Sequence, residues 1–158
     1  MRAGRRRRAS GGSAAALIVA ALLAGCGTTT KRDFVASADA ICAAAIHDSR
    51  ELVPPTSGQS GALADYLAKV VPIVASEYRQ MSALKRPAES RRDAATLSAY
   101  LLALKQSTAG FRTLEAAART GDRQGILSAE AALRVNPVTS LAASYGLRSC
   151  AAAGATVS

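Results

Sequence analysis

Residues 63–84 read LADYLAKVVPIVASEYRQMSAL, and they carry the strongest amphipathic pattern in this chain of 158 residues. Apolar side chains recur there at spacings of three and four, which is the repeat of one face of an α-helix. The residues that mark this face are Leu63, Leu67, Val70, Val74, Tyr78, Met81 and Leu84. Pro72 lies inside the pattern. Because proline removes a backbone donor and clashes with the preceding turn, we expect this helix to bend there before it ends near residue 85.

Helical patterns of the same kind lie on both sides of this stretch. Before it, Thr30 and Asp33 have the spacing of a capping box. The first helix is therefore expected over about residues 31–52, with Phe34 and Cys42 on its apolar face. A loop rich in proline, serine and glycine separates it from the second helix.

The second half of the chain predicts further helices. Ser90 and Asp93 form a second capping-box pattern, and Gly121 fits a C-terminal stop, so a third helix is expected over about residues 91–120. Gly110 lies inside it and costs about 1 kcal/mol relative to alanine. A glycine at this position would let a neighbouring helix approach closely.

Asp122 can cap a fourth helix, which is expected to end near Asn136. Pro137 then either begins a fifth helix or kinks the fourth, and the apolar residues that continue to Tyr145 fit both alternatives. Gly146 ends the last helix. The chain is rich in alanine, the best helix former, and it lacks period-two runs of β-branched residues. These patterns predict an all-α fold, an antiparallel bundle of four to five helices closed by one disulfide.

The first 26 residues differ from the rest of the chain. Residues 2–8 are mostly arginine, residues 14–23 are apolar, and small residues precede Cys26. This order is typical of a secretory signal peptide. As a helix, the apolar segment would span roughly 18 Å against a hydrocarbon core of about 30 Å, which is too short for a stable transmembrane helix. The arginines leave open whether export follows the general or the twin-arginine route.

The step Leu23-Ala24-Gly25-Cys26 resembles the bacterial lipobox. This resemblance implies a diacylglyceryl group on the Cys26 sulfur and cleavage just before it. Several acyl chains anchor a protein stably, so we expect a lipoprotein held on the membrane. An ordinary secreted protein with an incidental Cys26 is the alternative. The expected segments are a signal peptide at 1–25, the lipidated cysteine and tether at 26–33, the helical bundle at 34–150 and a flexible tail at 151–158.

Cys42 and Cys150 remain if Cys26 carries lipid. Two cysteines in an exported chain favour one disulfide, which would enclose nearly the whole domain. Closing a loop on the order of 100 residues contributes about 4.7 kcal/mol on loop-closure arguments. Two cysteines and His47, the only histidine, are too few ligands at these spacings for a metal site. We expect neither a metal nor another cofactor.

Four short stretches carry a resemblance to a group of proteins. They are Phe34 with Ala38-Asp39-Ala40-Ile41-Cys42, Leu84-Lys85-Arg86-Pro87, Gly121-Asp122, and Tyr145-Gly146-Leu147-Arg148-Ser149-Cys150. Together they resemble small, alanine-rich helical exported proteins and lipoproteins of actinobacteria, over most of the chain that follows the leader. The resemblance implies a disulfide that joins the two ends of the domain. It carries over no catalytic residues, because that group has no established activity.

The formal charge of +9 comes largely from the leader. Five of the 20 basic residues lie there, and the remaining 15 basic and 11 acidic residues give a net charge of +4. No long basic run remains, so we expect no nucleic-acid partner. Lys31 and Arg32 either contact anionic headgroups beside the tether or are solvated. Arg91 and Arg92 either receive an anion at a helix N-terminus or are solvated.

No arrangement of residues in the sequence predicts an active site. His47 has no nucleophile and orienting acid in a known order, no GxSxG elbow occurs, and the carboxylates stand at no telling spacing. We therefore expect no enzyme. The leading expectation is a non-enzymatic interaction or structural module of the cell envelope, lipid-anchored on the extracytoplasmic face of the cell membrane, that contacts an envelope protein or polymer. The alternative is a carrier or sensor with a small apolar ligand in the bundle core, where Pro72 and Gly110 loosen the packing.

Overall fold

The part of the chain that the computed structural model describes, residues 28–56 and 60–152, folds into α-helices and contains no strand. Six helices lie in these residues, so the predicted all-α class is confirmed. They are α1 (Lys31–Arg50), α2 (Ser60–Ala83), α3 (Arg91–Thr120), α4 (Arg123–Arg134), α5 (Val138–Tyr145) and α6 (Arg148–Ala152). None of them is long and apolar enough to cross a membrane.

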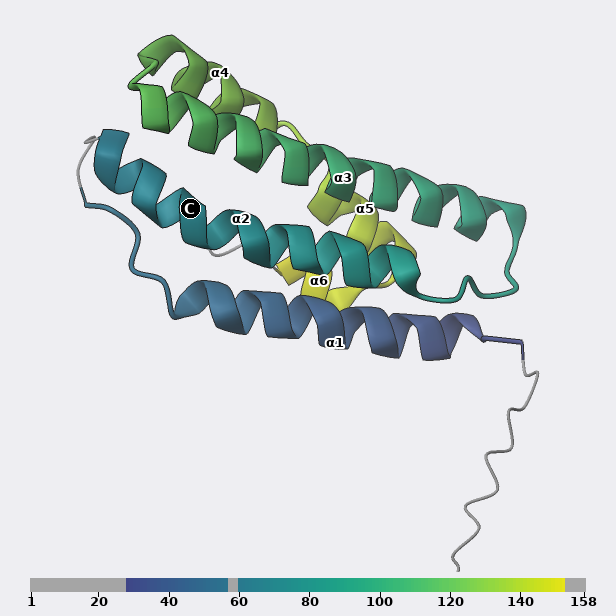
Figure 1. Cartoon of the computed structure of the whole chain (residues 1–158). Coiled ribbons are helices and arrows are strands. Elements are labelled where there is room, and N and C mark those ends of the chain that lie inside the picture. The colour runs from purple at the N-terminus through teal and green to yellow at the C-terminus, as the bar shows by residue number, and fades with distance from the viewer. Residues whose placement is uncertain (1–27, 57–59, 153–158) are drawn as a thin grey trace, which may run out of the picture.

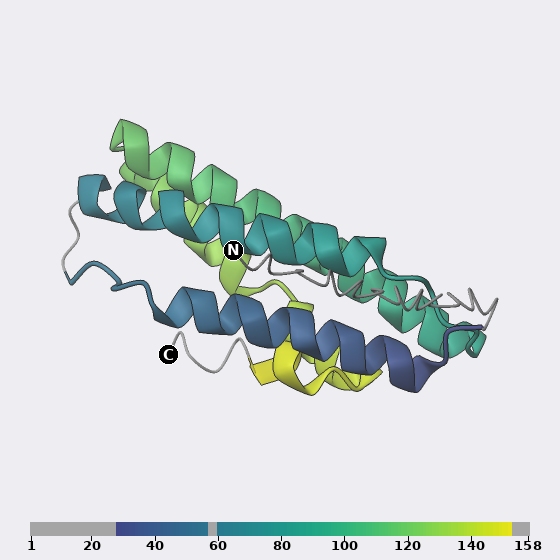
Figure 2. The same cartoon turned by 60° about the horizontal axis from the view of Figure 1, so that its bottom comes forward.

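The helices form an antiparallel bundle with α3 at its centre. Each of α2, α3 and α4 reverses the direction of the helix before it (Figure 1). Helix α3 packs against α2, α4 and α5, whereas α1 packs against α2 and α6. The short α6 therefore lies beside α1, as Figure 2 shows from another side. The first and last helices of the domain are neighbours, as a disulfide between them requires.

The helix starts follow the capping patterns with one difference. Thr30 and Asp33 form the complete capping box at the start of α1, as predicted. Ser90 accepts the backbone N–H of Asp93 at the start of α3, but the second box is only half formed. The carboxylate of Asp93 instead accepts from Lys31 Nζ at 2.9 Å. A charged donor makes the stronger hydrogen bond, so it takes the carboxylate away from the backbone of Ser90.

Two glycines end helices as the sequence predicts. Gly121 and Gly146 have φ values of 69° and 102°, in the left-handed region that suits a residue without a Cβ atom. The fourth and fifth helices are separate, because Pro137 is the N-cap residue of α5. Asn136 fixes this corner, since its Oδ1 accepts from the backbone N–H of Val138 and its Nδ2 donates to the α3 backbone, both at 3.0 Å.

Two boundaries differ from the expected ones. Residues 31–33, assigned to the tether, are the first turn of α1. Helix α6 was not predicted, and it contains Cys150 and the first two residues of the expected tail. Five residues are too few to show a periodic pattern, which explains why the sequence gives no sign of α6. Helix α2 continues through Pro72, as expected, and Ala68, whose carbonyl the proline cannot serve with an N–H, is exposed.

The core has two parts. The larger cluster surrounds the disulfide, and its buried members are Phe34, Ala38, Cys42, Met81, Leu97, Tyr100, Leu101, Leu104, Ala142, Tyr145, Leu147 and Cys150. The smaller one joins α2, α3 and α4, and its buried members are Ala64, Leu67, Leu114, Ala118 and Ala129. Gly110 lies beside the smaller cluster, where a Cβ atom would come within 2.8 Å of Leu133 on α4. The expected close approach of a helix at this glycine is confirmed.

Candidate functional site

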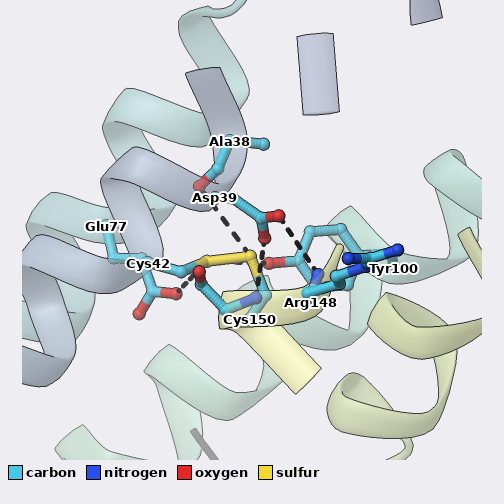
Figure 3. Close-up of a disulfide and its surroundings, with 8 residues drawn as sticks. Ala38, Asp39, Cys42, Glu77, Tyr100, Arg148 and Cys150 are labelled. Carbon is cyan, nitrogen blue, oxygen red and sulfur yellow. Dashed lines mark hydrogen bonds between the residues drawn. A yellow bond between two sulfur atoms is a disulfide. The ribbon is translucent and has the colours of Figure 1, made fainter. Parts of the chain in front are cut away.

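The disulfide joins Cys42 of α1 to Cys150 of α6, with their Cα atoms 5.1 Å apart (Figure 3). Cys42 lies on the apolar stripe of α1, three residues after Asp39 and eight after Phe34, so its side chain enters the larger core cluster. Both cysteines are almost fully buried, with exposed fractions of 1% and 5%. The pairing predicted from the cysteine count is confirmed.

Asp39 of α1 holds the start of α6 in place. Its two carboxylate oxygens accept the backbone N–H groups of Arg148 at 3.2 Å and Ser149 at 2.8 Å. These donors have no partner inside their own helix, so a carboxylate from another helix replaces the usual N-cap residue. Figure 3 shows the same carboxylate above the disulfide. Asp39 and the disulfide therefore fasten α6 to α1 at adjacent points.

Glu77 of α2 brings a carboxyl group to the same place. Its Oε1 atom lies 3.3 Å from Cys42 Sγ. A disulfide sulfur has no hydrogen to donate, so a hydrogen bond here requires the protonated carboxyl as donor and the sulfur as a weak acceptor. Burial raises the pKa of Glu77 from 4.5 to about 7, because the ionised form loses hydration. Both protonation states are consequently populated near neutral pH.

Tyr100 of α3 completes the surroundings of the disulfide. Its hydroxyl is 3.8 Å from Cys42 Sγ and its side chain is 1% exposed. Burial raises the pKa of Tyr100, and the negative charges of Glu77 and Asp39 raise it further. The phenol is therefore a neutral donor that faces the sulfur.

This arrangement is suited to a structural bond with a titratable neighbour. Thiol–disulfide exchange requires an attacking thiolate to reach one of the sulfurs. Both cysteines are buried within the larger core cluster. A bulky thiol therefore cannot reach either sulfur while the bundle stays folded. The reaction that remains possible at this site is protonation and deprotonation of the Glu77 carboxyl group.

A second polar cluster lies where α1 and α3 begin. Lys31 pairs with Asp93, and its ammonium also lies 4.6 Å from the ring centroid of Tyr145. This hydrogen bond lowers the pKa of Asp93. The Tyr145 hydroxyl donates to Glu89 Oε2 at 2.6 Å, and its ring meets Phe34 edge to face. Burial, followed by the hydrogen bond to Glu89, raises the pKa of Tyr145.

A groove of about 310 Å³ lies between α3 and the corner that joins α4 to α5. It is open to solvent on one side and is more apolar than polar. Its lining residues are Gln106, Gly110, Ala132, Leu133, Val135, Asn136 and Pro137. Val135 at its edge is 79% exposed and directly follows the last residue of α4, Arg134.

The remaining candidate residues are spread over the molecule. Cys26, the expected lipid attachment site, lies outside the described residues. The His47 imidazole is 76% exposed and lies 3.6 Å from Asp48, away from the disulfide. Arg91 and Arg92 are exposed at the start of α3. Within residues 28–56 and 60–152, no group of three or more histidine, cysteine, aspartate or glutamate side chains could hold a metal ion.

Sequence reasoning missed Glu77. One signal was present, because Glu77 is three residues after Val74 and four before Met81, which puts it on the apolar stripe of the second helix. An acidic residue on a buried stripe is unusual enough to mark a site. The sequence could not show that Cys42 of another helix lies opposite.

Comparison with known proteins gives no match for this chain. No protein-family model, no curated protein and no solved structure matches it.

Proposed function

We propose that this chain is a lipoprotein anchored through Cys26 on the extracytoplasmic face of the cell membrane, where it serves as a non-enzymatic interaction or structural module of the envelope. The proposal combines the signal-peptide and lipobox patterns of residues 1–26 with the folded domain that follows them.

The observation that carries the proposal is the buried bond between Cys42 and Cys150. Disulfides persist in oxidising compartments outside the cytoplasm and are rare inside it. This bond encloses a loop of more than 100 residues, with a sequence separation of 108, and it ties the first helix of the bundle to the last.

An interaction role is consistent with the observation that several polar side chains in the described part of the chain stabilise the fold. Asp39 caps α6, Asp93 pairs with Lys31, and Glu89 accepts from Tyr145, so these groups already serve the fold. The open apolar groove beside Val135 offers a surface to a partner protein or polymer. Grooves of this kind take side chains or short segments of a partner rather than small polar substrates.

The test is site-specific photo-cross-linking on native membranes. One photo-reactive residue replaces Val135 at the groove, and a matched control replaces Val53, a valine that is 86% exposed in the loop after α1. We expect the Val135 probe to capture an envelope component that the Val53 probe does not capture. Equal capture by both probes, or none by either while a lipid or metabolite co-purifies with the protein, would argue against an interaction module.

Anchoring is tested separately with Cys26→Ala. We expect the unsubstituted chain in the membrane fraction and the variant outside it. A variant that stays in the membrane fraction to the same extent would contradict lipid anchoring.

A carrier of a small apolar ligand is the second candidate. The groove volume of about 310 Å³ is at the lower end of the range for small-molecule sites, about 300–1,000 Å³. It lies at the corner beside Gly110 rather than inside the bundle core, and its open side leaves much of a ligand in water. Co-purification of a single lipid or metabolite that the Val135 probe labels would favour this candidate.

A further inference from the structure

One end of the bundle gathers basic residues from three segments. The start of α1, the α2–α3 loop and the start of α3 all lie at this end (Figure 1). Two contacts fix the arrangement: Lys31 pairs with Asp93 at 2.9 Å, and the backbone N–H of Ala88 donates to the Thr29 carbonyl at 3.2 Å. The basic residues of this end, hereafter the basic end, are Lys31, Arg32, Lys85, Arg86, Arg91 and Arg92.

The basic end holds most of the excess charge of the chain after the leader. Its six basic residues are accompanied by three acidic ones, Asp33, Glu89 and Asp93, whereas the rest of the chain after the leader has nine basic and eight acidic residues. The positive charge is thus concentrated at one end of an otherwise nearly balanced surface. Such a concentration attracts an anionic partner.

The three acidic residues are engaged within the fold. Asp33 completes the capping box with Thr30, and the other two carboxylates take the Lys31 ammonium and the Tyr145 hydroxyl. Arg32, Arg86, Arg91 and Arg92 are exposed to solvent. Their guanidinium groups are therefore the part of the basic end that faces outward.

The lipid attachment point is close to this end. Lys31 follows Cys26 by five residues, and five residues span at most about 18 Å when fully extended. This step rests on the proposed lipidation of Cys26. A chain anchored there holds the basic end, and no other end of the bundle, within reach of the lipid headgroups.

We infer that the basic end docks onto the anionic lipid headgroups of the membrane that holds the anchor. The bundle then stands on this end, and the groove lies partway along α3, at Gln106 and Gly110, about 22 Å or more from the start of that helix at 1.5 Å per residue. The lipid anchor holds the protein at the membrane, and the arginines set its orientation.

The experiment uses the mature lipidated protein in vesicles of phosphatidylcholine, with or without phosphatidylglycerol. An environment-sensitive fluorophore is introduced as an unnatural amino acid at Ala95, near the basic end, or at Ser128 on α4, and the vesicles carry a headgroup-linked quencher. We expect quenching of the Ala95 probe only with phosphatidylglycerol, and little quenching of the Ser128 probe on either vesicle. Quenching should disappear near 1 M salt, where the screening length is about 3 Å.

Two triple variants provide the matched comparison. One replaces Arg86, Arg91 and Arg92 with glutamine, and its control replaces three exposed arginines elsewhere, namely Arg112, Arg123 and Arg134. At about 1 kcal/mol for each arginine near an anionic surface, the first variant should shift the equilibrium between docked and undocked protein roughly a hundredfold. The control should behave like the unsubstituted protein.

The outcomes separate the two proposals. Dissociation of the protein from vesicles both with and without phosphatidylglycerol would contradict the proposed lipid anchor at Cys26. Protein that stays on the vesicles but is quenched equally with and without phosphatidylglycerol, or loses quenching equally in both triple variants, overturns the docking inference alone. A basic end that binds soluble polyphosphate but gives no quenching on anionic vesicles assigns this surface to an acidic polymer, and that also overturns the inference.

Discussion

Replacing Glu77 with glutamine should change how the stability of the bundle depends on pH. Burial against the disulfide raises the pKa of this carboxyl from 4.5 to about 7 in the folded protein. A folded state with the higher pKa binds a proton more tightly than the unfolded chain, so this group favours folding below about pH 4.5. That contribution is lost as the pH rises through about 7.

The size of the effect follows from the two pKa values. The rise from 4.5 to about 7 corresponds to about 3 kcal/mol between the protonated and ionised forms. The side chain keeps partial contact with solvent, which reduces the penalty on its charge. We therefore expect the free energy of unfolding to fall by about 1 to 3 kcal/mol from pH 4.5 to pH 8 on account of Glu77.

The assay is urea unfolding of the oxidised protein, followed by circular dichroism across this pH range. Glu77→Gln removes the ionisable group and keeps a donor beside the sulfur, so its stability relative to the unsubstituted protein should rise with pH and level off above about 7. The control is Glu51→Gln at the exposed end of α1, which should leave the pH profile unchanged. Parallel profiles for the unsubstituted and Glu77→Gln proteins would refute the reasoning.

Three further predictions concern contacts that hold the helices together, and each is measured by urea unfolding. Asp39→Ala removes both acceptors at the start of α6 and should lower the free energy of unfolding by about 1 to 2 kcal/mol, and an unchanged value would show that α6 needs no cap. Gly110→Ala places a methyl group 2.8 Å from Leu133, whereas Gly61→Ala meets open space, so the Gly110 variant should be the less stable of the two by about 1 to 3 kcal/mol. Replacing both cysteines of the disulfide with alanine should cost about 2 to 5 kcal/mol without changing the helical content at low temperature, and a loss of helix there would show that the bond is needed to form the bundle.

Features that depend on neighbouring residues in the chain could be predicted from the sequence. The three-and-four spacing of apolar residues located the first three helices and the segment of the fourth and fifth, whose separation it left open. Local chemistry located helix ends at Thr30, Gly121 and Gly146. The pairing of Cys42 with Cys150 followed from counting, because the expected lipid on Cys26 would leave two thiols in a chain expected to be exported. None of these inferences needs knowledge of which helices meet.

Apart from the disulfide and the close approach at Gly110, features that depend on contacts between helices could not be predicted. Helix α6 is short, and it is held by Asp39 from the other end of the chain. Asp93 leaves its expected capping box because folding brings Lys31 to it. The position of Glu77 on the apolar stripe is visible in the sequence, but the disulfide sulfur that it faces is not. The basic end is likewise assembled from segments more than 50 residues apart, so no basic run in the sequence reveals it.

The most direct test of the account is the intact mass of the protein extracted from its own membrane, measured with and without a reductant. The account predicts a chain that begins at Cys26, carries a diacylglyceryl group there, and gains two hydrogen atoms on reduction as the bond between Cys42 and Cys150 opens. A chain that keeps residues 1–25 with an unmodified Cys26, or a mass that reduction leaves unchanged, would contradict it.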